Sequence, residues 1–149
     1  MDKIKHYEDN IVQCINMFNS IVLDIKNAIK SDMPDDMELK IYYIAIEATI
    51  KYNVMTPILL FIQHIYANDM IRRKLIEKDE AFFANSSHAT LGLSEKNKKD
   101  IDMFFQFQNC WKELSDDSKE YIKEAMFTLV NTAKTYIKIR GKIDDIKKK

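Results

Sequence analysis

Histidine and cysteine are the side chains that most often supply a base, a nucleophile or a metal ligand near neutral pH. The chain has three histidines, His6, His64 and His88, and their positions match no metal-ligand spacing such as HExxH. Its two cysteines, Cys14 and Cys110, lie far apart and belong to no CxxC pair. The sequence therefore predicts no metal ion, no cofactor and no thiol chemistry. We expect His64 to be exposed or hydrogen-bonded and Cys110 to be a buried, inert thiol.

Two pairs of adjacent carboxylates, Asp35 with Asp36 and Asp116 with Asp117, are of the type that performs general acid–base catalysis. Each pair falls where a helix is predicted to begin, and carboxylates there cap the helix and complement its dipole. The chain has only two glycines in 149 residues and contains no phosphate-binding loop or dinucleotide fingerprint. We therefore expect a protein that is not an enzyme.

Adjacent aromatic residues occur at two places, Phe82-Phe83 and Phe104-Phe105-Gln106-Phe107. Neighbouring side chains on a helix point about 100° apart, so not all of these rings are expected to reach one core. One interpretation is a central helix that is buried on several sides. The other is an exposed apolar surface that binds a partner protein. The second interpretation predicts interaction residues at Phe82, Phe83, Phe104 and Phe107.

The charges balance, with 23 basic and 23 acidic residues and a formal net charge of zero. A nucleic-acid-binding protein usually carries a positive excess, because its affinity comes largely from neutralising phosphates. The bases are nevertheless clustered locally, with acids close by, and solvated helix faces would explain such clusters. If the clusters met on one face, they would form a nucleic-acid interface made of Arg72, Arg73, Lys74, Lys96, Lys98 and Lys99.

The elements that position these residues are predicted to be helices throughout. Apolar residues recur at helical spacing, and no strand-period run is flanked by hairpin signals. The sequence predicts a single all-α domain over residues 1–149, a bundle of about five helices with one long loop at residues 85–94. The helices expected are residues 3–30, 34–52, 56–76, 95–114 and 115–140, with a short helical turn at 80–84. Ser94 and Ser115 are expected to cap the last two of these helices. Gly141 is predicted to end the last helix and to begin a flexible, Lys-rich tail at residues 141–149.

Two of these helices carry further expectations. The helix over residues 34–52 is predicted to turn inward Ile41, Tyr42, Ala45, Ile46 and Thr49. The helix over residues 3–30 has apolar rows at heptad spacing, Ile4, Ile11, Phe18 and Ile25 with Ile15, Val22 and Ile29, widened by Cys14 and Ile21. Either the later helices bury these rows within one chain, or a second copy packs on them and forms a homodimer.

No apolar run is long enough to span a bilayer, and residues 1–10 have no signal-peptide core. Two isolated cysteines are typical of a reducing compartment. We therefore expect an intracellular protein that is not secreted and has no membrane span.

Two stretches carry a resemblance to known proteins. The first is residues 55–65 (MTPILLFIQHI) with residues 78–83 (KDEAFF), and the second is residues 109–122 (NCWKELSDDSKEYI), which continue into Leu129 and Val130. Over roughly residues 37–137 the chain resembles small uncharacterised α-helical proteins of nucleocytoplasmic large DNA viruses. It departs from their pattern at Lys123 and Glu124, where a second aromatic residue is expected. Ile, Lys and Asn, which A/T-rich codons specify, make up about a third of the chain.

The resemblance implies a viral helical protein of the host cytoplasm or the virion, and it assigns no functional residue. Together with the lack of a catalytic pattern, it leads to the hypothesis of a non-enzymatic protein that acts through protein–protein contact, as a virion component or as a factor of the replication site. One alternative is a viral Bcl-2-like decoy that holds a helix of a host factor in a groove. Against it, the Asn-Trp-Gly-Arg signature is missing, and Trp111 is the only tryptophan. The other alternative is a nucleic-acid-binding accessory protein.

Overall fold

The computed structural model describes residues 2–84 and 95–148. Within these residues the chain forms seven α-helices, one π-helical segment and one 3-10 segment, and no strand. The all-α class is therefore confirmed, with more helices than the five expected. The predicted loop at 85–94 lies outside the described residues, as does the Ser94 cap that was expected for the next helix.

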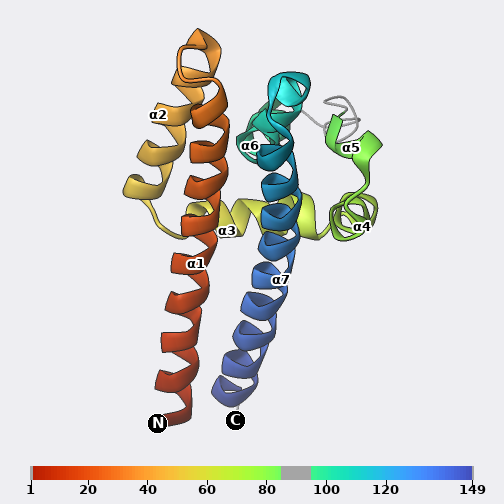
Figure 1. Ribbon diagram of the computed structural model, residues 1–149. Coiled ribbons are helices and arrows are strands. Elements are labelled where there is room, and N and C mark those ends of the chain that lie inside the picture. The colour runs from red at the N-terminus through yellow and green to blue at the C-terminus, as the bar shows by residue number, and fades with distance from the viewer. Residues whose placement is uncertain (1, 85–94, 149) are drawn as a thin grey trace.

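The two longest helices of the described residues are α1 (Asp2–Asp32) and α7 (Asp116–Lys147). They are antiparallel, and their outer ends lie side by side (Figure 1). The predicted heptad rows of α1 are buried from Ile11 to Ile29, mainly against α7. At the other end of the pair, the backbone N–H of Ser115 donates a 2.9 Å hydrogen bond to the Asp32 carboxylate. This bond lowers the pKa of Asp32. The rows that suggested a homodimer through α1 are thus covered within one chain.

Helix α2 (Met37–Tyr52) lies along α1 and runs in the opposite direction. Asp36 caps it, because its carboxylate accepts the backbone N–H of Leu39 at 3.0 Å. Lys26 of α1 is buried and donates to Glu47 of α2 at 2.6 Å, which lowers the pKa of Glu47. Tyr43 donates its hydroxyl to the carbonyl of Met33 at 3.0 Å. The contacts of Glu47 and Tyr43 thus tie the middle of α2 to α1 and to the turn that follows it.

The helix predicted over residues 56–76 is three elements: α3 (Thr56–Phe61), the π-helical segment η1 (Ile62–Tyr66) and α4 (Asp69–Glu77). In η1 the N–H of Ala67 bonds to the carbonyl of Ile62, five residues back. Asn68 then leaves the helical conformation and caps α4 by accepting the N–H of Ile71. The prediction of one continuous helix was wrong because Asn68 offers the backbone this alternative hydrogen bond. The short helix α5 (Glu80–Ala84) follows.

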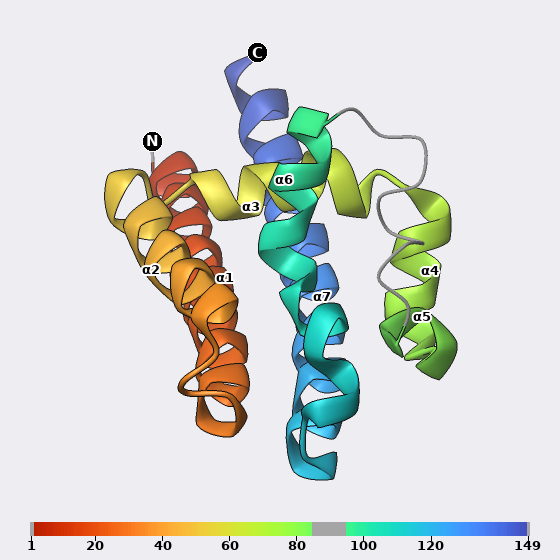
Figure 2. The same ribbon diagram turned by 90° about the horizontal axis from the view of Figure 1, so that it is seen from above.

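Figure 2 shows α6 (Glu95–Phe105) crossing in front of α3 and η1, with α1 and α2 on one side and α4 and α5 on the other. After Phe105 the predicted fourth helix tightens into the 3-10 segment η2 (Gln106–Glu113), which is kinked at Cys110. Ser115 then caps α7, as predicted, by accepting the N–H of Ser118 at 3.1 Å. The kink turns η2 so that its aromatic side chains face α5.

Helix α7 does not end at Gly141 but continues to Lys147, so residues 141–147 are not the separate tail that the sequence predicted. Ile143 is fully buried, and the ammonium group of Lys142 lies 5.6 Å from the ring centre of Tyr7 on α1. Packing against α1 thus outweighs the cost of a glycine within a helix, which is about 1 kcal/mol relative to alanine.

We therefore expect Gly141→Ala to raise the free energy of unfolding by about 0.5–1 kcal/mol. The added Cβ would meet no atom within 4 Å, so it introduces no clash. Urea denaturation followed by circular dichroism at 222 nm measures the change. A destabilised variant would show that residue 141 is not in a regular helix.

Among the described residues, no single helix is both long and apolar enough to cross a membrane. Only α2 taken together with α3 and η1 passes that test, as a pair bent by 108°. Helices α2 and α3 of this pair also line the candidate site.

Candidate protein-interaction site

The aromatic residues that the sequence placed on an interaction surface are buried. Phe82, Phe83, Phe104 and Phe107 expose at most 5% of their area. Phe83 stacks on Phe107 at 5.5 Å between ring centres, and Trp111 lies 5.6 Å from Phe83. The prediction of an exposed surface was wrong because Phe82, Phe83 and Phe107 lie on short elements, α5 and η2, that face each other. Phe104 lies on α6 and packs on Phe18 and Phe61. Rings pointing in different directions are therefore all covered.

The two predicted basic clusters lie on different helices, α4 and α6. Arg72 pairs with Asp69 and stacks over Tyr66, and Lys74 pairs with Asp79 at 3.1 Å, so two bases of the α4 cluster are locally neutralised. Arg73 is exposed. Helix α4 packs on α7 and η1, whereas α6, which carries the second cluster, packs on α3, η1 and η2 (Figure 2).

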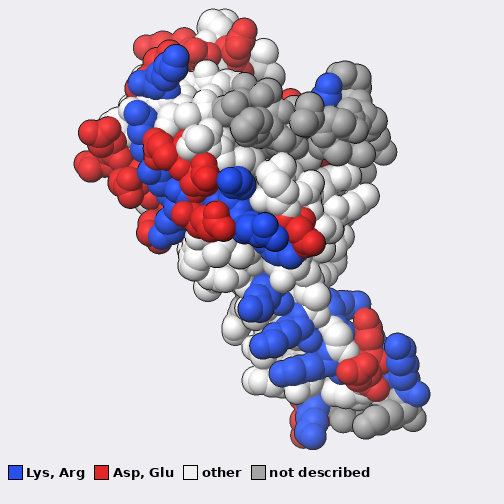
Figure 3. Space-filling view, turned by 90° about the vertical axis from the view of Figure 1, so that its right-hand side faces the viewer, with Lys and Arg blue, Asp and Glu red and all other residues white. Residues whose placement is uncertain are grey.

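In that second cluster Lys99 is exposed and Lys98 half-buried, and the side chain of Lys96 lies outside the described residues. On the side of the molecule that Figure 3 shows, basic and acidic residues alternate over the body, and bases dominate only along the projecting arm. On this side of the molecule, the described bases therefore do not make a continuous basic face.

The histidines and Cys110 have the following surroundings in the part of the chain that the structure describes. His64 lies in η1 with its Nε2 atom 3.5 Å from a carboxylate oxygen of Asp100, and His6 contacts Asn10. His88 lies outside the described residues. Cys110 is buried as predicted, and burial raises the pKa of its thiol to about 11. No group of three or more metal-ligating side chains occurs within residues 2–84 and 95–148.

The exceptional element is α2, which is apolar on two opposite sides. One side carries Leu39, Tyr42, Tyr43 and Ile46 into the core. The other side exposes six apolar residues at three- and four-residue spacing, Met37, Ile41, Ile44, Ala45, Ala48 and Tyr52. We call these six residues the α2 face. Its four large members are 73% (Met37), 72% (Ile41), 70% (Ile44) and 92% (Tyr52) exposed. A helix that is apolar all round is normally buried on all sides.

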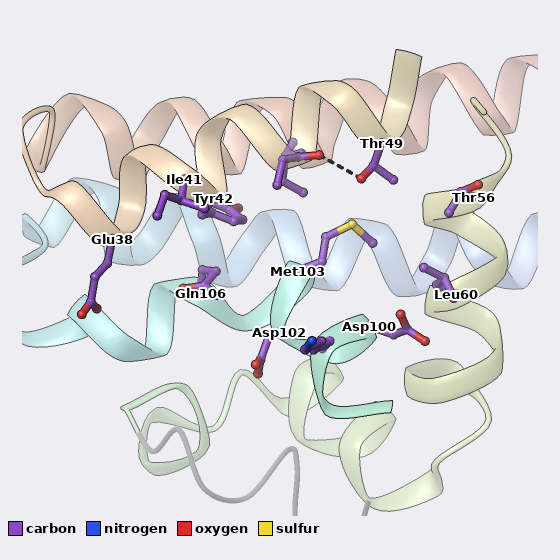
Figure 4. A pocket seen from close by; sticks show the side chains of 13 residues that line it. Glu38, Ile41, Tyr42, Thr49, Thr56, Leu60, Asp100, Asp102, Met103 and Gln106 are labelled. Carbon is purple, nitrogen blue, oxygen red and sulfur yellow. Dashed lines mark hydrogen bonds between the residues drawn. The ribbon is translucent and has the colours of Figure 1, made fainter. Parts of the chain in front are cut away.

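The α2 face adjoins a groove between α2, α3 and α6, with a volume of about 610 Å³. Figure 4 shows Met103 of α6 directed toward α2 and Leu60 of α3 directed into the groove from its end. On α2 the wall is formed by Ile41, Ala45 and Thr49 among others. The Thr49 hydroxyl donates to the Ala45 carbonyl at 2.8 Å and is therefore satisfied within α2. We call this feature the α2–α6 groove.

The rim of the α2–α6 groove is acidic on balance. Glu38, Asp100 and Asp102 line it together with a single base, Lys99. At its floor, burial raises the pKa of Tyr42, so its hydroxyl stays neutral at physiological pH. The groove thus offers an apolar floor with a negatively charged edge.

Sequence reasoning placed this site wrongly. Ile41 and Ala45 were predicted to face the core, whereas both are exposed. The available signal was the width of the apolar arc of α2, because its exposed polar side is only a narrow strip with Lys40, Glu47 and Lys51. A helix that packs on a single core needs a narrower apolar arc than the one on α2.

Comparison with protein-family models, with curated proteins and with solved structures finds no match for this chain.

Proposed function

We propose that this chain is a non-enzymatic protein-interaction module that binds an amphipathic helix of another protein in the α2–α6 groove. The observation that supports this most is the exposed apolar wall of the groove, above all Ile41. Monomeric proteins seldom leave a contiguous apolar surface uncovered unless it binds something. A helix docks into such a groove through side chains at positions i, i+3, i+4 and i+7.

The charges of the rim favour one kind of helix. With Glu38, Asp100 and Asp102 beside the apolar floor, a partner helix that carries Lys or Arg next to its apolar stripe is complementary. Rim charges of this kind mainly steer association and select the partner. On the resemblance alone, we also propose that the chain is a viral protein that acts as a virion component or as a replication-site factor. A groove that holds a helix is also the feature shared with the Bcl-2-like alternative.

The test uses two positions on α2 that point to different sides. Thr49→Arg fills the α2–α6 groove without altering the α2 face, and Ile44→Lys alters the α2 face without lining the groove. Proteins are captured from lysates of host cells, or of virus-infected host cells, with the wild type and with both variants. The captured proteins are then compared.

We expect a partner that the wild type and Ile44→Lys retain and that Thr49→Arg loses at least about tenfold, because one blocked anchor costs about 1.4 kcal/mol or more. Thermal melts of the three proteins establish that all are folded. Equal capture by Thr49→Arg and the wild type would contradict the proposal.

A further inference from the structure

Part of the α2 face lies outside the α2–α6 groove. Ile44, Ala48 and Tyr52 belong to the α2 face but do not line the α2–α6 groove. A helix seated in the groove would therefore leave these three side chains in water. An occupant of the whole α2 face must match an exposed stripe on a helix of 16 residues, and it would exclude a groove-bound helix from Ile41 and Ala45, which belong to both the α2 face and the groove.

We propose that this occupant is the α2 face of a second copy of the chain, packed antiparallel about a two-fold axis near residues 44 and 45. The order of side-chain sizes and the order of charges along α2 support this dimer, independently of the function proposed for the groove.

The sizes of the side chains are self-complementary in the antiparallel direction. About an axis between residues 44 and 45, Ile44 lies opposite Ala45 of the partner, and Ile41 lies opposite its Ala48. Large residues thus meet small ones, which allows the two helices to approach closely and interdigitate. Met37 lies opposite the partner's Tyr52 at each end of the pair, so the axis generates every contact twice.

The charges on the polar edge of α2 are self-complementary in the same direction. Asp36, Lys40, Glu47 and Lys51 follow one another along this edge with alternating sign. Read in reverse, the signs are opposite at every place, so Lys40 of one copy lies opposite Glu47 of the other, and Lys51 opposite Asp36. Within its own chain Glu47 also accepts from Lys26, and Asp36 caps α2, so each carboxylate would be shared between two partners. The centre of this pattern, between residues 43 and 44, is one residue from the centre of the apolar pattern. In an antiparallel pair the same edge of both helices comes together, whereas in a parallel pair opposite edges do. A parallel pair would therefore have neither the match of sizes nor the match of charges.

The expected dimer is weak. A helix of 16 residues is about 24 Å long. That is shorter than the heptad seams that sustain stable coiled coils, so we expect a Kd in the micromolar range. The zero net charge of the chain adds no repulsion between copies.

The first measurement is the mass of the full chain by sedimentation equilibrium between about 1 and 500 µM. We expect the mass to rise from 17.6 kDa toward twice that value. Ile44→Lys and, independently, Ala48→Lys are expected to weaken the dimer at least tenfold, and Thr49→Arg is expected to leave it unchanged. Since Ile44 and Ala48 are exposed, both lysine variants should retain the wild-type melting temperature.

The second measurement tests the direction of packing, in a Cys14→Ser background treated with a short bifunctional maleimide. Ala45→Cys, next to the axis, is expected to cross-link. Tyr52→Cys is not, because the two copies of residue 52 would be about 22 Å apart along the antiparallel pair. Cross-linking through residue 52 instead would overturn the antiparallel arrangement.

A wild type that stays monomeric throughout, or a dimer that Ile44→Lys leaves intact, would overturn the inference. Neither result would bear on the α2–α6 groove, whose own test is the loss of a captured protein in Thr49→Arg.

Discussion

Replacing Phe107 by alanine is expected to lower the free energy of unfolding by about 3–5 kcal/mol, the cost of removing a fully buried aromatic ring. Phe107 is 0% exposed. Its ring centre lies 5.5 Å from that of Phe83, 5.7 Å from Phe105 and 5.8 Å from Trp111. The cavity would open between η2 and α5, two short elements that have few other contacts to absorb the loss. Such a change is a large part of the stability of a typical domain.

Urea denaturation followed by tryptophan fluorescence measures this effect, because Trp111 belongs to the same cluster. Ile76→Ala on α4 is the control, since Ile76 is 44% exposed and should change stability by no more than about 0.5 kcal/mol. If Phe107→Ala kept the wild-type stability, the ring would be on the surface, as one of the two interpretations of the sequence predicted.

Ile143→Ala is expected to cost about 2–4 kcal/mol, although the sequence placed this residue in a flexible tail. Ile143 is 0% exposed and lies two residues beyond Gly141, on the part of α7 that packs against the first turns of α1. Removing its side chain should loosen the end of the α1–α7 pair before the rest of the molecule unfolds, since two helices alone form that end (Figure 1).

Amide hydrogen exchange distinguishes this local opening from global destabilisation. We expect faster exchange in residues 136–147 and in the first turns of α1, with smaller changes in α3. The matched control is Asp145→Ala on the exposed side of the same turn. Equal exchange in Ile143→Ala and the control would mean that the arm is not held by this contact.

Local signals predicted the parts of the fold that local chemistry decides. The heptad rows of α1, the Ser115 cap of α7 and the all-helical class depend on neighbouring residues, and the structure contains all three. Asp36 serves as a cap because a carboxylate just before a helix can reach the free N–H groups of its first turn. The helix end at Gly141 failed because a preference of about 1 kcal/mol is smaller than the gain from burying Ile143.

The site could not be located by the same means. Helical periodicity identifies apolar positions, but on α2 these positions fill two opposite sides, and only the placement of α1 decides which side becomes core. The aromatic runs pose the converse problem. Consecutive rings such as Phe82 and Phe83 look exposed on a long helix, yet they are buried when a five-residue helix meets a kinked 3-10 segment. Both outcomes depend on tertiary packing, which outweighs the local pattern.

The pairing of α1 with α7 also has a consequence for how the chain folds. The Asp32–Ser115 hydrogen bond that closes this pair joins residues 83 positions apart. Contacts between residues so distant in sequence slow folding, because a long loop must close before they form. On the ribosome, α1 emerges well before α7, and its isoleucine rows lack their main cover until more than 80 further residues have been made. During that interval the nascent chain presents an uncovered amphipathic helix, the kind of segment that chaperones bind and that aggregates when they are scarce.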